Sequence, residues 1–278
     1  MKRANTPSRW WQLPDAVWER IEPLLPKRPT RDPSIGGRPP VPDRQAMNGI
    51  VFVLRTGCQW NALNATGICS SSTAHLRFQQ WRKAGVFEQL WANGLNEYDE
   101  VKGIDWAWQS MDGAMTKAPL GGKKTGPNPT DRAKDGVKRS LLCEGAGVPI
   151  GLAIEGANRH DMRLVEPTLQ SIPVARPRPT RKAPQGLCLD KGYDYEEVRK
   201  LVRQFGYTAH IRARGEEAQA IKRQAGFKAR RWVVERTHSW MNRFRRIVIR
   251  WEKIPENYLA MLHVVCAVIT LRCAAVLG

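Results

Sequence analysis

Acidic side chains are scarce in this sequence relative to basic ones. Its 278 residues include 26 Asp and Glu against 45 Lys and Arg, which gives a net charge of +19. A surface of that sign attracts polyanions and repels cationic partners. Nucleic acid is the commonest polyanionic partner and an anionic membrane surface the next, so the charge favours a nucleic-acid-binding protein.

Cysteine pairs, a secretion signal and an uninterrupted apolar span are also missing. The six cysteines include no CxxC pair, so we expect neither a disulfide framework nor a zinc site, but small side chains in a reducing compartment. The N-terminal stretch MKRANTPSRWWQLPD has no apolar signal region, so we expect a cytoplasmic protein. Residues 259–277 are apolar, but His263 and Arg272 interrupt them. We therefore expect a buried core helix there and no membrane span.

The apolar pattern divides the chain into a helical part, a mixed part and a second helical part. Apolar residues recur at helical spacing near the start, and later short apolar runs alternate with helical patterns, which predicts a mixed α/β sheet flanked by helices. The sequence EGAG at residues 144–147 predicts a hairpin turn. Helices are expected over residues 14–25, 43–55, 71–83, 161–169, 195–205 and 230–251, and strands over residues 105–111, 137–142, 148–154, 186–189 and 207–212.

Two aspartates follow predicted strands. Asp112 comes after WAWQSM, and Asp190 comes after GLCL. A single aspartate in this setting is more often a turn or N-cap residue. Two of them in one sheet favour a functional site, because open α/β sheets place their sites at the carboxyl ends of strands. Asp161 competes with Asp190, but an N-cap role for the helix that follows it is the simpler interpretation.

A third carboxylate, Glu235, lies in the helix predicted over residues 230–251. Helical geometry puts Glu235 with other polar residues opposite an apolar stripe. The simple alternative is a solvent-exposed pair between Arg231 and Glu235, four residues apart. Three converging carboxylates would instead repel one another unless cations bound between them. Their oxygens suit Mg²⁺ or Mn²⁺, and two such ions can catalyse phosphoryl transfer.

Longer motifs carry a resemblance to a known family. The segments TGPNPTDRAKDGVKRS, ANRHD, LCLDKGYD, HIRARGEE and RRWVVERTHSWMNRFRR occur in this order from residue 125 to residue 246. They resemble bacterial insertion-sequence transposases of the acidic-triad (DDE) class, in the branch around insertion sequence five. The stretch GGRPP…DRQAMNGIVFVLRTGCQW resembles the helical DNA-binding domain of that group. The likeness extends over roughly residues 10 to 275.

The resemblance implies a fold and a set of site residues. It implies a helical, helix-turn-helix-like DNA-binding domain over residues 1–100 and an RNase H-like catalytic domain over residues 101–278. Asp112, Asp190 and Glu235 would be catalytic and would bind two Mg²⁺ or Mn²⁺ ions. Some relatives carry tyrosine where Lys228 stands and lysine where Asn242 stands. Expected DNA contacts are Lys123, Lys124, Arg132, Lys138, Lys191, Arg231, Arg243, Arg245 and Arg246. Expected supporting residues are His160, Asp161, His238 and Asn242.

The expected activity is DNA transposition. The chain would bind the terminal inverted repeats of an insertion sequence, hydrolyse the element ends and join the freed 3′-hydroxyl to target DNA. Its partner would be double-stranded DNA, held by a homodimer or a larger synaptic assembly near the bacterial nucleoid. The alternatives are a catalytically inactive DNA-binding protein, an RNase H-like nuclease that cuts without joining and, more remotely, a membrane-surface protein.

Overall fold

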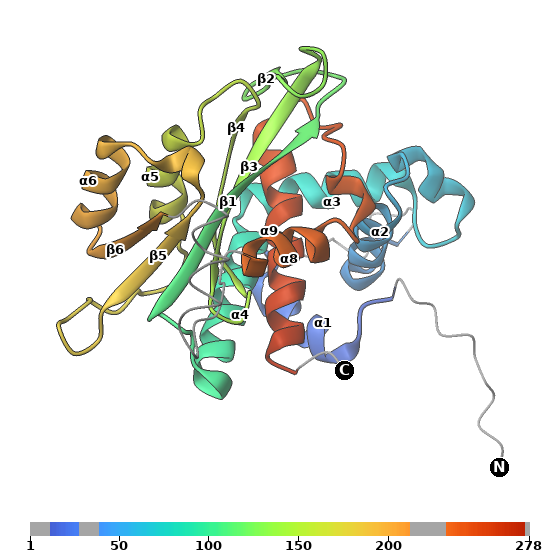
Figure 1. Ribbon diagram of the computed structural model, residues 1–278. Coiled ribbons are helices and arrows are strands. Elements are labelled where there is room, and N and C mark those ends of the chain that lie inside the picture. Colours follow the sequence, from blue (N-terminus) through green and yellow to red (C-terminus); the bar gives the residue numbers. More distant parts are fainter. Residues whose placement is uncertain (1–11, 28–38, 212–231, 276–278) are drawn as a thin grey trace.

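Helices make up the N-terminal part of the chain. The structure is a computed structural model that describes residues 12–27, 39–211 and 232–275 (Figure 1). The first predicted helix is divided: α1 ends at Ile21 and a short 3-10 turn continues over Glu22–Leu24, because Pro23 has no N–H to continue the α-helical pattern. Helix α4 was not predicted as a separate helix. The helices here are α1 (Asp15–Ile21), α2 (Asp43–Thr56), η2 (Trp60–Ala65), α3 (Ser71–Lys83) and α4 (Val86–Lys102).

A mixed sheet forms the centre of the molecule. The strands are β1 (Trp108–Lys117), β2 (Gly126–Pro127), β3 (Asp135–Glu144), β4 (Pro149–Gly156), β5 (Gln185–Leu189) and β6 (Tyr207–Ile211). Strand β3 pairs antiparallel with β1, β2 and β4, whereas β5 pairs parallel with β1 and β6. The five predicted strands and the hairpin between β3 and β4 are confirmed. The two-residue strand β2 was not predicted.

Strand β1 is longer than its sequence pattern predicted. The predicted strand ended at residue 111, but β1 continues to Lys117 because β3 pairs with it as far as Gly136. Asp112 is therefore within an antiparallel pair, not at the end of a strand. The parallel pairing with β5, in contrast, is recorded only up to Ser110 opposite Cys188. Asp112 thus lies just beyond the point where β1 and β5 separate.

Helices cover both faces of this sheet. Two neighbouring residues of β3, Ser140 and Arg139, show which helices lie on which face, because successive side chains of a strand point to opposite faces of the sheet. Ser140 receives a hydrogen bond from Thr168 of α5 (Met162–Gln170), and Arg139 donates one to Asn242, just after α8 (Trp232–Met241). Helix α6 (Glu196–Gln204) lies with α5 at the β5–β6 side, and α9 (Pro255–Cys273) lies with α8 (Figure 1). This arrangement confirms the predicted α/β fold with an RNase H-like core and an N-terminal helical region.

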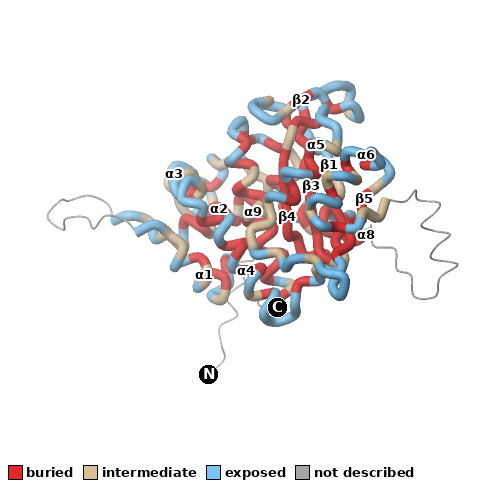
Figure 2. The backbone as a smooth tube through the Cα atoms, turned by 90° about the vertical axis from the view of Figure 1, so that its left-hand side faces the viewer, coloured by how far each residue is buried: buried red, intermediate tan, exposed pale blue. Residues whose placement is uncertain are grey.

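Helix α9 joins the sheet to the N-terminal helices. It packs against α4 and β4, and most of its residues are buried (Figure 2). Among the described residues it is the one helix long and apolar enough to cross a membrane, but 67% of its apolar window is buried inside the protein. On α4, the Trp91 indole N–H donates to the Pro149 carbonyl at 3.0 Å, and its ring lies 5.5 Å from the ring of His263 on α9. The predicted core helix is confirmed.

The half-buried His263 predicts that the protein loses stability in mild acid. Burial lowers the pKa of His263 to about 4, so the folded protein keeps it neutral, whereas the unfolded chain binds a proton below about pH 6.5. Its stabilising contribution is complete above that pH. It decreases as the pH falls towards 4, by about 1.4 kcal/mol per pH unit. Urea unfolding at pH 7.5 and pH 5.5 measures this loss.

Replacing His263 by Gln should reduce the loss of unfolding free energy between these two pH values by about 1.4 kcal/mol. The exposed His75 provides a matched control, His75→Gln, for the effect of replacing a histidine on stability. If His263→Gln has the same pH dependence as the native chain, the imidazole is not the group that makes the core acid-sensitive.

Candidate active site

The sheet brings Asp112 and Asp190 to neighbouring strands. Ser110 of β1 lies opposite Cys188 of β5, so Asp112 and Asp190 each follow this last pair by two residues. Both side chains are half-buried. One oxygen of Asp112 accepts from the Gly113 N–H, and one oxygen of Asp190 accepts from the Gly192 N–H, both at 2.8 Å. Backbone groups thus orient both carboxylates where the two strands separate.

A buried phenol lies among these acids. Tyr193 follows Asp190 in a short 3-10 turn, and its side chain is 1% exposed. Burial raises the pKa of Tyr193, and the charges of Asp161, Asp112 and Asp190 raise it further. Asp161 therefore lies near the two strand aspartates, and Tyr193 stays neutral among three negative charges.

Asp161 does not have the N-cap role expected for it. It precedes α5, but its side chain makes no capping hydrogen bond to that helix. One of its oxygens lies 3.0 Å from Lys138 Nζ, and the same oxygen would be only 2.6 Å from a Cβ placed on Gly113. The absence of a side chain at Gly113 thus gives Asp161 room beside Asp112. Asp161 does not cap α5 because its carboxylate pairs instead with Lys138 of β3, a residue distant in sequence that local capping rules do not consider.

Lys138 does not fit the DNA contact predicted for it. The residue is 6% exposed, and its ammonium group donates to the Arg159 carbonyl at 2.8 Å as well as pairing with Asp161. Both bonds point into the protein. Lys138 therefore lies inside the protein, where its charge neutralises that of Asp161, and a DNA phosphate cannot reach it.

Glu235 reaches the same region on a separate helix. The Thr237 hydroxyl donates to the Gly147 carbonyl at 2.8 Å, which fixes α8 against the β3–β4 turn. Nε2 of His238 lies 3.4 Å from the Asp112 carbonyl oxygen. Glu235 is exposed and precedes His238 by three residues, so both side chains are on one side of the helix. Helix α8 thus places Glu235 near the strand that carries Asp112.

His238 is buried, although helical spacing had put it on the polar face. Burial and the nearby Arg139 guanidinium lower its pKa to about 3. The neutral ring can carry its proton on Nε2 and donate it to the Asp112 carbonyl. His238 therefore links α8 to β1 as an uncharged group.

The helix predicted over residues 230–251 is shorter in the structure. Of this range, residues 230 and 231, and with them the predicted DNA contact Arg231, lie outside the described residues. Helix α8 ends at Met241, and Phe244 has an extended backbone. The Arg250 N–H then donates to the Lys117 carbonyl at 2.8 Å. Pairing with the end of β1 replaces the helix here.

The oxygen donors of the site suit a hard divalent cation. Carboxylates bind Mg²⁺ and Mn²⁺ well, and Asp112 and Asp190 lie on adjacent strands, where they could hold such an ion. Across the described residues, no three Asp, Glu, His or Cys side chains are grouped closely enough to hold a metal ion. The structure places the two strand aspartates on adjacent strands and Glu235 on helix α8, which contacts β1 through His238.

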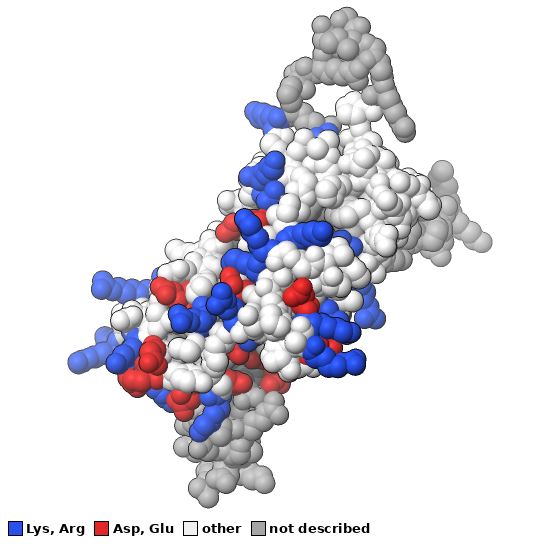
Figure 3. Space-filling view, turned by 90° about the horizontal axis from the view of Figure 1, so that it is seen from above, with Lys and Arg blue, Asp and Glu red and all other residues white. Residues whose placement is uncertain are grey.

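The other predicted DNA contacts differ in exposure. Lys123, Arg132, Lys191, Arg243 and Arg245 are exposed, whereas Lys124 is exposed but paired with Glu155 at 3.1 Å. Basic side chains are spread over the upper face of the molecule, with acidic ones among them (Figure 3). Arg246 is 6% exposed and paired with the buried Glu252. Its position does not fit a phosphate contact, because both ion-pair partners are inside the protein.

A buried arginine that the sequence did not single out shapes the basic loop after β1. Arg250 is 1% exposed, and its guanidinium donates to the carbonyls of Lys123 and Lys124 at 2.7 and 2.9 Å. These bonds hold the loop against the segment after α8, so the exposed side chain of Lys123 is presented from a fixed backbone.

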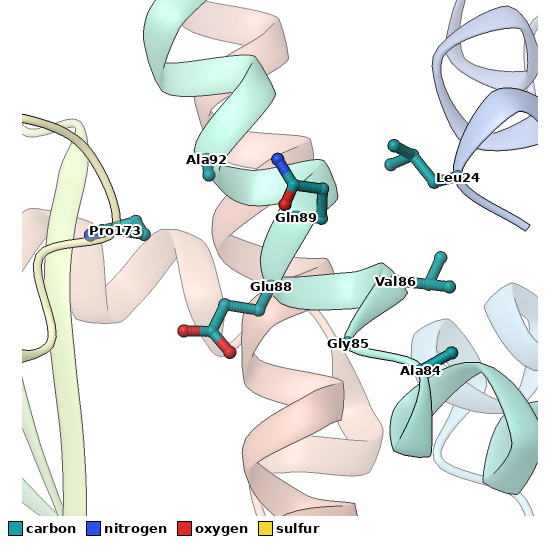
Figure 4. Close-up of a pocket in the computed structure, with 8 residues that line it drawn as sticks. All are labelled: Leu24, Ala84, Gly85, Val86, Glu88, Gln89, Ala92 and Pro173. Carbon is teal, nitrogen blue, oxygen red and sulfur yellow. The ribbon is translucent and has the colours of Figure 1, made fainter.

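Two of the expected supporting residues, His160 and Asn242, contact different parts of the protein. Nε2 of the exposed His160 lies 3.3 Å from the Tyr195 hydroxyl, and Asn242 is exposed while it accepts from Arg139. A cavity of 330 Å³ lies elsewhere, beside Glu88 and Gln89 of α4 and the Ala84–Gly85 turn (Figure 4). None of the predicted site residues lines it, so it does not compete as the active site.

Comparisons with known proteins agree with this architecture. A family model described as "Transposase DDE domain" matches residues 109–270, and one described as "Putative transposase of IS4/5 family" matches residues 13–91. A putative transposase for insertion sequence element IS402 from Burkholderia cepacia is 38% identical over 152 residues, which are 54% of this chain and 69% of that protein. An uncharacterized 16.2 kDa protein of the IS402 element, also from Burkholderia cepacia, is 36% identical over 118 residues, which are 42% of this chain and 80% of that protein.

One solved structure, the Mos1 strand transfer complex, is 11% identical, with 88% of this chain and 81% of that chain covered. Its TM-score of 0.28 is too low to support an argument about this protein. The family evidence rests on the sequence matches, because the DDE model alone extends over more than half of the chain. The chain belongs to the DDE transposases of the IS4/IS5 group, and it is a transposase enzyme of a family that depends on divalent metal.

Proposed function

We propose that this transposase binds the terminal inverted repeats of an insertion sequence and catalyses cleavage and strand transfer at Asp112, Asp190 and Glu235. One observation carries the proposal. Asp112 and Asp190 lie where two parallel strands separate, and His238 links the helix that bears Glu235 to the Asp112 backbone. In this class of site, acids on separate elements bind the cations used in phosphoryl transfer.

The proposed roles of the residues follow from their positions. Asp112, Asp190 and Glu235 would hold two Mg²⁺ or Mn²⁺ ions, which activate the attacking oxygen and stabilise the leaving oxygen. The exposed side chains of Lys191, Arg243 and Arg245 would hold phosphates of the DNA backbone. We assign DNA binding to residues 1–100 and catalysis to residues 101–278. Two element ends must be held together, so we expect a homodimer or a larger assembly.

The test is a strand cleavage and joining assay on DNA that carries the element's own ends, in Mg²⁺ or Mn²⁺. We expect a joined product from the native chain and none from Glu235→Gln. Glu256→Gln, which changes an exposed glutamate at the start of α9, should retain activity. Cleavage without joining by the native chain would indicate a nuclease. Binding without cleavage would indicate a DNA-binding protein that is not active.

A further inference from the structure

Helix α3 has one buried face and one polar face. Ala74, Phe78 and Trp81 are at most 2% exposed and pack into the N-terminal core. On the opposite side, residues that recur at intervals of three and four form one stripe along the helix. The exposed residues of this stripe are Ser72, His75, Leu76, Gln80 and Lys83, with the half-buried Gln79 between them.

The chemistry of this stripe suits the major groove of DNA. Glutamine can bond in a bidentate manner to adenine, and lysine can bond to guanine. Histidine and serine can bond to base edges, and the side chain of Leu76, which is 56% exposed, can contact the methyl group of thymine. The helix sequence SSTAHLRFQQWRK contains three basic residues and no Asp or Glu. This charge, carried by Arg77, Arg82 and Lys83 in the second half of the helix, complements a polyanion.

Neighbouring elements hold α3 in a fixed position. The Ser70 hydroxyl accepts from the Thr73 N–H at 3.3 Å and caps the helix. Trp60 of η2 packs against Phe78, with ring centroids 5.7 Å apart. Arg77 pairs with Asp43 of α2 at 3.2 Å. The polar stripe is thus presented by a rigid element at the periphery of the molecule, where Figure 2 shows α3 outside the buried centre.

The two glutamines are oriented by arginines of the same helix. The side-chain oxygen of Gln80 accepts from Arg77 at 2.8 Å, and that of Gln79 accepts from Arg82 at 3.3 Å. Each amide is therefore held by a bond along the helix, and its NH₂ group is not used in that bond. Helix α4 does not offer a comparable surface, because α9 covers much of it.

We propose that α3 is the recognition helix of this transposase, and that Gln79 and Gln80 read base edges in the major groove of the terminal repeats. The inference rests on the proposed function, because it needs specific binding to the element's own ends. An α-helix fits the width of the major groove. Lys83, at the last turn, contacts phosphate and contributes affinity without sequence preference.

The experiment measures the dissociation constant of the full chain for the element's own ends and for unrelated DNA of equal length, at one salt concentration. The double variant Gln79→Ala/Gln80→Ala should bind the ends at least about 10-fold more weakly, with binding to unrelated DNA unchanged. The control is Gln89→Ala on α4, an exposed glutamine that bonds to Asn93 at 2.8 Å. It should bind both DNAs as the native chain does.

A second readout separates base reading from a structural effect. Replacing the adenines of the repeat by 7-deazaadenine removes the N7 acceptor that glutamine uses. The native chain should bind this DNA more weakly than the unmodified ends. The double variant should bind the modified and the unmodified ends equally, because it has already lost the glutamine contacts. Full retention of specificity by the folded double variant, or equal loss for both DNAs, would overturn the role of α3. A native chain that does not distinguish its ends from unrelated DNA would overturn the proposed function as well.

Discussion

Asp112→Asn is expected to abolish strand cleavage while the protein still binds DNA. The substitution keeps the shape of the side chain but removes the charge that a divalent cation needs beside Asp190. Residues that act as a unit lose most of the activity when one is removed, so we expect a decrease of about 10⁴-fold or more in the single-turnover cleavage rate. The measurement uses DNA with the element's own ends in Mg²⁺, with binding followed separately.

Asp161→Asn provides the matched comparison, since Asp161 lies in the same acidic region. Lys138 already neutralises its carboxylate at 3.0 Å, so we expect a decrease of only about 10-fold. The exposed Asp194, which pairs with Arg199, supplies a control that should keep native activity when changed to Asn. If Asp161→Asn is as inactive as Asp112→Asn, then Asp161 must be counted among the metal-binding acids.

Arg246→Ala is expected to destabilise the fold by about 3–5 kcal/mol, because it removes one partner of a buried ion pair. The Arg246 guanidinium donates to one oxygen of Glu252 through two nitrogens at 2.7 and 2.9 Å, and to the Cys58 carbonyl at 3.1 Å. Without it, Glu252 would keep a charge at 8% exposure. Urea denaturation of the full chain measures the change.

Two further variants separate burial from charge. Arg243 is close in sequence but exposed, so Arg243→Ala should alter the unfolding free energy by less than about 0.5 kcal/mol. The double variant Arg246→Met/Glu252→Leu should recover much of the stability, because neither charge remains inside. A loss below about 1 kcal/mol in Arg246→Ala would be incompatible with a buried pair.

The sheet and its two aspartates could be predicted because their signals are local. Short apolar runs mark the strands, and an aspartate after a run marks a place where a strand leaves its neighbour. The assignment of Asp190 needs only residues 187–190. The full length of β1 could not be obtained in this way, because its continuation beyond Asp112 is fixed by pairing with β3, whose partner residues from Gly113↔Ser140 to Lys117↔Gly136 lie 27 to 19 residues further along the chain.

The errors also have a common physical cause, which is contact between distant segments. Phe244, Ile247 and Trp251 keep helical spacing, but α8 ends before them at Met241, and the backbone of Arg250 bonds to Lys117 instead of continuing a helix. Lys138 and Arg246 looked like surface cations, since a charged residue is usually exposed. Instead, Lys138 pairs with Asp161, and the Arg246 guanidinium donates to the Cys58 carbonyl, so each cation is held inside the protein by a residue far from it in the chain.

The contact between α4 and α9 has a consequence for how the protein is made. The chain between Lys102 and Pro255 must be translated before α9 can cover the apolar side of α4. At bacterial and eukaryotic elongation rates this takes on the order of 10–30 s. Until then the N-terminal helices leave the ribosome without the contacts that α9 makes with α4, among them the one between His263 and the Trp91 ring. The helices assigned to DNA binding would therefore complete their core only after most of the catalytic segment has been synthesised, so a prematurely terminated chain should be a substrate for chaperones and proteases and not a competing DNA-binding fragment.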